Sequence, residues 1–251
     1  IITGANVTNP NLVDEPFWKP LIEIVDWAKV NVASIFCSCL ATHALIKHYH
    51  GIDRQRQPRK VWGVYSHKLA HPEHPILRDV NTRFDAPHSR FNDISREQME
   101  SAGLTVLAES AEVGVHLAVS PDGFRAVYFQ GHPEYARVSL LKECKREVQR
   151  YLAGEREREP RIPQNYLTGE GIALANAHMV DVIAAKRSGR TPPEFPEEKL
   201  LEHVDNTWGD TGRAIVNNWL GLVYQLTNLD RKQQFMPGVD PDDPLQLRHP
   251  T

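Results

Sequence analysis

The sequence predicts an α/β fold with an open, mostly parallel sheet that is flanked by helices and extended by an antiparallel hairpin. Two observations carry this prediction. In the first fifty residues, short β-branched runs alternate with helical periods, an order that favours parallel strands joined by helices. Later, three strand-like runs follow one another within 104–131, and the turn Ser-Pro-Asp-Gly at 120–123 predicts a hairpin between the last two.

Strand and helix signals alternate in the first part of the chain. Residues 1–5 and 32–38 are short apolar runs rich in β-branched side chains, and we expect both as strands. Residues 17–31 carry apolar side chains at helical spacing. A second helix is expected over 39–51, where Gly51 is a suitable C-terminal cap.

The middle of the chain is expected to be mostly strands. Residues 60–70 alternate between apolar and polar side chains, as a half-buried strand does. A short helix over 95–103 is indicated by a capping box, Ser95 with Gln98, and by a terminal glycine. Three more strands are predicted over 104–110, 113–120 and 124–131.

The last third is expected to be helical. Residues 134–154 place Leu141 and Val148 on one side of an amphipathic helix, and two further helices are predicted over 169–189 and 213–226. Residues 190–198 are expected as a surface connection.

We expect residues 1–227 to form a single domain and residues 228–251 an extended tail. The chain opens directly on an apolar strand, so we also expect that βα units preceding this strand are missing from it.

Composition excludes several classes of function. The formal net charge is −3, and no basic run is interleaved with aromatic residues, so nucleic acid is not an expected partner. No apolar stretch is long enough to span a membrane. The charged block at 155–161 is typical of a solvated helix end. The three cysteines are too few and too irregularly spaced for a disulfide framework or a zinc site, which indicates a reducing cytoplasm.

Cys39 is the first candidate for chemistry. It lies where a predicted strand passes into a helix, a position that raises the side chain above the sheet edge and directs helix N-terminal N–H groups toward it. This is the geometry of a nucleophile elbow without its usual glycines. A small buried cysteine would look the same. Cys37 and Cys144 are expected to be packing residues.

His132 and Glu134 follow the end of another predicted strand, at Gly131. The pair could belong to a solvated loop. Together with Cys39, however, it supplies the parts of a Cys–His–Glu triad, in which the histidine takes the thiol proton and the carboxylate orients the ring. In an open parallel sheet both strand ends lie on the carboxyl edge, where ligands bind.

Several ordered motifs support this interpretation. They are "TGA" near the start, "FCSCLAT" followed by "YHGI" around Cys39, "KVWGVYSH" at 60–67, "APHSR" at 86–90, "GHPEY" at 131–135, and "NNWL" with "VYQLT" at 217–227. In these motifs the chain resembles the homoserine O-succinyltransferase/O-acetyltransferase family, a branch of the class I glutamine amidotransferase-like, flavodoxin-like fold.

The resemblance implies a ping-pong acyl transfer in methionine biosynthesis, from succinyl-coenzyme A as co-substrate to the hydroxyl of L-homoserine. It assigns Cys39 as the acyl-carrying nucleophile, His132 as the base and Glu134 as its orienting partner. We expect no metal and no bound cofactor, small-molecule substrates, and a homodimer.

The resemblance also implies substrate contacts from Lys60, Ser89 and Arg146. Each has a plainer alternative, since Lys60 and Arg146 could be surface charges and Ser89 a turn residue. Thr8 occupies the position at which the family carries Gly or Glu and which governs acyl choice. The segment 169–200 is longer than the family pattern.

Other functions are compatible with the same residues. Acetyl-coenzyme A could be the donor and L-serine the acceptor. A glutamine amidotransferase or amidase on the same fold would share the triad, although "CSCLAT" lacks a glycine-flanked elbow. A non-catalytic binding protein could retain the fold, and alkylation of Cys39 ahead of Cys37 and Cys144 at neutral pH would distinguish the two cases.

We predict that Thr8→Glu removes a preference for succinyl over acetyl donors. Thr8 is uncharged and can donate a hydrogen bond to the succinyl carboxylate. A glutamate there would place two negative charges about 4 Å apart, which costs on the order of 1 kcal/mol in water and several times more in a partly dry pocket. The measurement is kcat/KM for both donors. A parent that prefers acetyl, or an unchanged ratio in the variant, contradicts the prediction.

Overall fold

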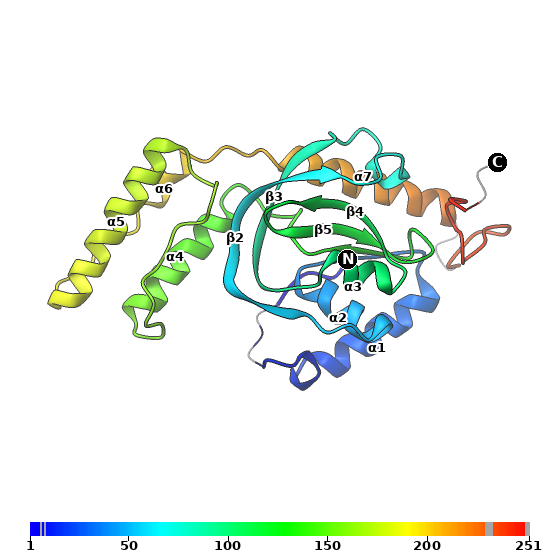
Figure 1. Cartoon of the computed structure of the whole chain (residues 1–251), viewed down its shortest axis with the longest axis horizontal. Coiled ribbons are helices and arrows are strands. Elements are labelled where there is room, and N and C mark those ends of the chain that lie inside the picture. Colours follow the sequence, from blue (N-terminus) through cyan, green and yellow to red (C-terminus); the bar gives the residue numbers. More distant parts are fainter. Residues whose placement is uncertain (6, 8, 229–232, 249–251) are drawn as a thin grey trace.

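The computed structural model describes residues 1–5, 7, 9–228 and 233–248, and its ribbon is drawn in Figure 1. The strands are β1 (Ile35–Ser38), β2 (Gln55–Leu69), β3 (Arg83–Asp93), β4 (Thr105–Ser110), β5 (Gly114–Val119) and β6 (Ala126–Phe129). The α-helices are α1 (Trp18–Asn31), α2 (Leu40–His50), α3 (Arg96–Ser101), α4 (Ser139–Leu152), α5 (Gly169–Ser188), α6 (Glu197–Leu201) and α7 (Gly209–Thr227). Two short 3₁₀ helices lie at Leu12–Asp14 and Pro75–Leu77.

The six strands form one curled sheet in the order β1-β6-β5-β4-β2-β3. The α/β class with flanking helices is confirmed, but the expectation of a mostly parallel sheet is wrong for the described residues. Only β1 and β6 pair in parallel, and an isolated parallel bridge joins Ile2 to Cys37. All other pairs are antiparallel, because short connections without a crossover helix join β2 to β3, β4 to β5 and β5 to β6.

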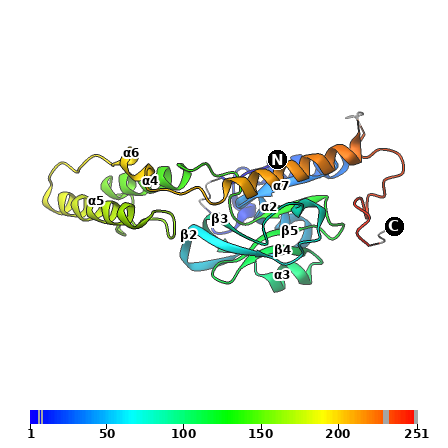
Figure 2. The ribbon, with the colours of Figure 1, turned by 90° about the horizontal axis from the view of Figure 1, so that it is seen from above.

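Helices cover both faces of this sheet. On one face, Trp219 and Ile215 of α7 pack against Phe36 and Phe129. On the other face, α1, α2 and α3 cover Cys37 and its neighbours. Figure 2 shows α7 and α3 on opposite sides of the strands. Both faces of the sheet centre are therefore covered by apolar side chains from the helices.

Helices α4, α5 and α6 form an extension beside β2 (Figure 1). They enclose their own apolar cluster, to which β2 contributes Trp62 and Val64. The segment that follows α4 returns to the sheet and forms an isolated parallel bridge between Gln164 and Gly63. A side chain at Gly63 would meet the Gln164 carbonyl oxygen at 2.1 Å, so this close approach requires glycine.

The predicted elements lie close to the observed ones, with several differences. The strand predicted over 1–5 is reduced to an isolated bridge at Ile2, and β2 begins at Gln55, five residues before the predicted start. Strand β3 was not predicted, because its Pro87 and polar residues hide the alternation. Helix α4 begins at Ser139, five residues after the predicted start, since residues 134–138 turn around the loop that follows β6. The connection 190–198 runs into the short helix α6.

The tail after α7 contacts the same cluster that α7 covers. Phe235, Val239 and Leu245 pack against it, and the Met236 N–H donates to the carbonyl of Leu226 at 2.8 Å. Part of the predicted tail, residues 229–232 and 249–251, lies outside the described residues. The division at residue 227 stays a prediction. None of the described helices is long and apolar enough to cross a membrane.

Candidate active site

Cys39 connects β1 to α2 with an unusual backbone. Its φ is 52° and its ψ is −112°, a region that a residue with a Cβ enters only when its surroundings hold it there. Here the Cys39 N–H donates to the carbonyl of Phe129 at the end of β6, at 2.7 Å. The Thr42 hydroxyl donates to the same carbonyl at 2.7 Å. The predicted strand-to-helix elbow is therefore present and is fixed by the neighbouring parallel strand.

His132 and Glu134 lie in the loop directly after β6. Glu134 Oε1 is 2.8 Å from His132 Nδ1, and the Ser38 hydroxyl donates to the same oxygen at 3.1 Å. The Tyr135 ring stacks on the imidazole with centroids 4.1 Å apart. With Nδ1 held by Glu134, Nε2 is the ring nitrogen that remains for Cys39.

The Cys39 and His132 side chains interact directly. Cys39 lies close enough to His132 to raise the pKa of its ring. A methyl group built on Gly4 would lie 3.8 Å from both the Cys39 Sγ and the His132 Cε1, so the small residue of "TGA" borders both groups. The three predicted triad residues are thus brought together, although 93 residues of sequence separate Cys39 from His132.

The electrostatics favour an ion pair. Burial lowers the pKa of His132, but hydrogen bonds with Cys39 and Glu134 outweigh it and raise this pKa to about 10. Burial acts to raise the pKa of Glu134, and the hydrogen bond from His132 lowers it overall. The ring is therefore held as an imidazolium at neutral pH.

The other two thiols are in different surroundings. Cys37 is fully buried and Cys144 nearly so, and burial raises the pKa of each thiol to about 12. Both stay protonated near neutral pH and have no exposed sulfur to offer a substrate. Their predicted role as packing residues is consistent with these positions.

Lys60 and Ser89 meet at a residue that the sequence did not single out. Glu143 Oε2 accepts from Ser89 Oγ at 2.6 Å and from Lys60 Nζ at 3.2 Å, and Oε1 accepts from the Tyr135 hydroxyl at 2.5 Å. Burial acts to raise the pKa of Glu143, but Lys60 and the hydroxyl donors lower it overall. The Tyr135 hydroxyl binds this buried carboxylate and the Tyr135 ring stacks on His132. Glu143 therefore connects the predicted substrate-binding residues to His132.

A sequence signal for Glu143 existed. Glu143 lies three residues after Leu140 on α4 and therefore shares the buried face of the helix, where a carboxylate needs hydrogen-bond partners. Arg146 lies one turn further along, is exposed, and forms no ion pair with any residue that the structure describes. Thr8 lies outside the described residues.

Gly131 marks the end of β6 for a steric reason. A side chain there would meet His116 Nδ1 at 2.7 Å and the Pro87 carbonyl oxygen at 2.8 Å. The backbone therefore crosses directly over the buried His116 ring, and the His132 N–H donates to the same Pro87 carbonyl at 2.8 Å. Glycine at this position allows the base to be held against β3.

His116 belongs to a buried trio with His67 and His88, whose ring nitrogens lie within 4.8 Å of one another. Such a trio could in principle hold a metal. Burial lowers the pKa of all three rings. Arg90 Nε donates to His88 Nδ1 at 3.3 Å, so the His88 proton is on Nε2 and points at His67, 3.1 Å away. To bind a metal through Nε2, His88 would have to carry its proton on Nδ1 instead, but Nδ1 already accepts a hydrogen bond from Arg90.

Comparison with known proteins gives a consistent picture. The family model described as HTS: Homoserine O-succinyltransferase matches residues 1–229. A protein from Methylococcus capsulatus named Homoserine O-succinyltransferase is 58% identical over 247 residues, which cover 98% of this chain and 70% of that protein. One of the same name from Allochromatium vinosum is also 58% identical, with 98% and 69% covered.

Solved structures are more distant. A glutamine amidotransferase from Thermotoga maritima aligns with a TM-score of 0.44 at 13% identity, covering 88% of this chain and 77% of that one. A glutamine amido transferase from Methylobacillus flagellatus aligns with a TM-score of 0.43 at 16% identity, covering 74% and 76%.

We predict that the pKa of His132 depends on Cys39. In the parent protein the ring should stay protonated through neutral pH, because its pKa is raised to about 10. Cys39→Ala removes one of the two side chains that raise this pKa while burial still opposes the charge, so the pKa should fall toward the ordinary value of 6.5. NMR titration of the imidazole measures both values, with Cys144→Ala as the control. An unchanged titration in Cys39→Ala would show that the two side chains do not interact.

Proposed function

The chain belongs to the homoserine O-succinyltransferase family, and from this premise we propose that it transfers the succinyl group of succinyl-coenzyme A to the hydroxyl of L-homoserine through a thioester on Cys39. The observation that carries the proposal is the contact of Cys39 with His132, whose ring is held in turn by Glu134 at 2.8 Å. A thiolate–imidazolium pair oriented by a carboxylate is the arrangement that covalent acyl transfer needs.

In the first half-reaction, the Cys39 sulfur attacks the thioester carbonyl. A bond forms between Sγ and the acyl carbon, and the bond from that carbon to the coenzyme A sulfur breaks. His132 gives its proton to the departing thiolate, so that coenzyme A leaves as a neutral thiol. One thioester replaces another, and neither metal nor redox chemistry is required.

In the second half-reaction, neutral His132 removes the proton of the homoserine hydroxyl as its oxygen attacks the acyl carbon. The bond to Sγ breaks, and the thiolate and the imidazolium are both restored. Glu134 fixes the tautomer and stabilises the cation in each cycle. The first N–H groups of α2 have no acceptor within the helix and are suited to hold the oxyanion.

Substrate positioning is assigned to three residues. Arg146 carries an exposed guanidinium that can bind the amino-acid carboxylate with two hydrogen bonds. Lys60 and Ser89 act from fixed positions, because both are held by Glu143. The three free cysteines fit a reducing cytoplasm, where we propose that the enzyme acts. A homodimer stays a prediction.

We predict that Cys39→Ala abolishes acyl transfer and that Cys37→Ala retains most of it. Cys37 is close in sequence but buried, and burial keeps its thiol protonated. The measurement is the intact mass after incubation with succinyl-coenzyme A without homoserine. The parent and Cys37→Ala should gain one succinyl group, and Cys39→Ala should gain none. Equal loss of the adduct in both folded variants would refute Cys39 as the nucleophile.

We predict non-additive losses for the other two triad residues. His132→Asn should lower kcat by about 10²–10⁴-fold, because it removes the general acid and base. Glu134→Gln should lower kcat strongly with the protein still folded. Since the triad acts as a unit, the double variant should be little worse than His132→Asn alone. Losses that multiply in the double variant would mean that Glu134 acts separately from His132. A glutaminase assay of the parent tests the amidotransferase alternative.

A further inference from the structure

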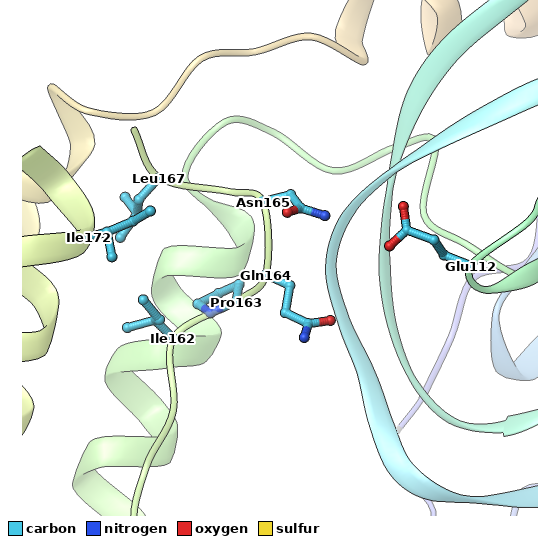
Figure 3. A pocket seen from close by; sticks show the side chains of 7 residues that line it. All are labelled: Glu112, Ile162, Pro163, Gln164, Asn165, Leu167 and Ile172. Atoms are coloured by element: carbon cyan, nitrogen blue, oxygen red, sulfur yellow. The ribbon is translucent and has the colours of Figure 1, made fainter. Parts of the chain in front are cut away.

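A cleft of about 710 Å³ opens between β2 and the segment that follows α4. It adjoins a smaller pocket of about 280 Å³, drawn in Figure 3, with which it shares Glu112, Ile162 and Gln164. Figure 3 shows Gln164 and Asn165 pointing across the gap toward β2, with Glu112 on the far side of the strand. The larger cleft has the size of a ligand site.

The lining of this cleft is rich in cations, although the whole chain carries a net charge of −3. Five cationic side chains face it, against three carboxylates; the cations are Arg59, Lys60, Arg156, Arg158 and Arg161. Two carboxylates are already neutralised, since Glu147 pairs with Arg156, and Glu159 pairs with Arg187 at 2.8 Å.

Three of the arginines lack such partners. Arg59, Arg158 and Arg161 form no ion pair with any residue in the described ranges. Guanidinium groups at a concave surface bind phosphate with charge-assisted hydrogen bonds. The cleft therefore favours an anionic ligand with phosphate groups.

The wall of the cleft also holds an unused donor. Trp62 is 8% exposed, and its indole Nε1–H is buried without a hydrogen-bond partner. Lys60 Nζ lies 4.6 Å from the centre of the Trp62 ring. A buried donor beside an ammonium group is suited to an acceptor supplied by a ligand.

Lys60 also links the cleft to the candidate active site. Its ammonium group reaches Glu143, which binds Tyr135, and the Tyr135 ring stacks on His132. A ligand that entered the cleft and passed Lys60 would thus approach the reacting groups. The donor in the proposed reaction has this shape, because its phosphates lie at the opposite end of a long arm from its thioester.

We propose that this cleft binds the phosphate-bearing nucleotide end of the acyl-coenzyme A donor, with Arg158 and Arg161 as phosphate ligands and the Trp62 indole as a donor to the arm. The inference rests on the proposed function and extends it. It gives the charged block at 155–161 a role in donor recognition, where the sequence alone indicated a solvated helix end.

The test compares two donors, succinyl-coenzyme A and succinyl-pantetheine, which has the same thioester but no phosphate. In Arg158→Gln/Arg161→Gln, KM for succinyl-coenzyme A should rise about tenfold or more, as expected for lost phosphate contacts. KM for succinyl-pantetheine and for homoserine should stay unchanged. Arg213→Gln on α7, an exposed arginine paired with Asp210, is the matched control and should behave as the parent.

The proposal is overturned if the double variant changes KM equally for both donors, or changes KM for neither. Calorimetric titration with coenzyme A alone separates this result from a failure of the proposed function, because it needs no turnover. If the parent transfers acyl groups from neither donor, the proposed reaction is wrong. If coenzyme A binds the parent and binds the double variant more weakly, the proposed role of the cleft is still supported. If coenzyme A binds both proteins equally, or does not bind the parent, the proposal is refuted.

Discussion

The parallel pairing of β1 with β6 holds the candidate nucleophile and its base at one edge of the sheet. Ser38 and Phe129 are register partners at the ends of these strands, so the residues that follow each strand emerge side by side. The Phe129 carbonyl accepts from both the Cys39 N–H and the Thr42 hydroxyl, which holds the elbow in its strained conformation. Nucleophile and base are therefore positioned by one strand pair.

The loop after β6 depends on a buried polar layer beneath it. The Gln130 side chain is fully buried, and its carboxamide accepts from the Ile94 N–H and donates to the Ile94 and Val115 carbonyls. His116 fills the space under Gly131. The hydrogen bonds of the Gln130 carboxamide restrict the backbone to one path, because any other path would leave this buried group unpaired. The orientation of His132 is thus set from below by the sheet and from the side by Glu134.

The helical extension completes the site from the side of β2. Glu143 on α4 gathers donors from β2, β3 and the loop after β6, so its carboxylate joins the extension to the sheet. The segment after α4 then returns to pair with Gly63 and forms one wall of the cationic cleft. Packing of α4 to α6 on Trp62 and Val64 therefore also determines the shape of this cleft.

The sequence by itself determined the α/β class, the positions of most helices and the choice of Cys39, His132 and Glu134 as candidate site residues, because periodicity, caps and strand ends are local signals. The mixed sheet, the path of β3 and the roles of Glu143, Tyr135 and His116 were decided only by the tertiary structure. Each depends on residues tens of positions apart that share one hydrogen bond or one close approach. For Gly131 the sequence marked a strand end, but only the fold supplied the reason, which is the His116 ring beneath it.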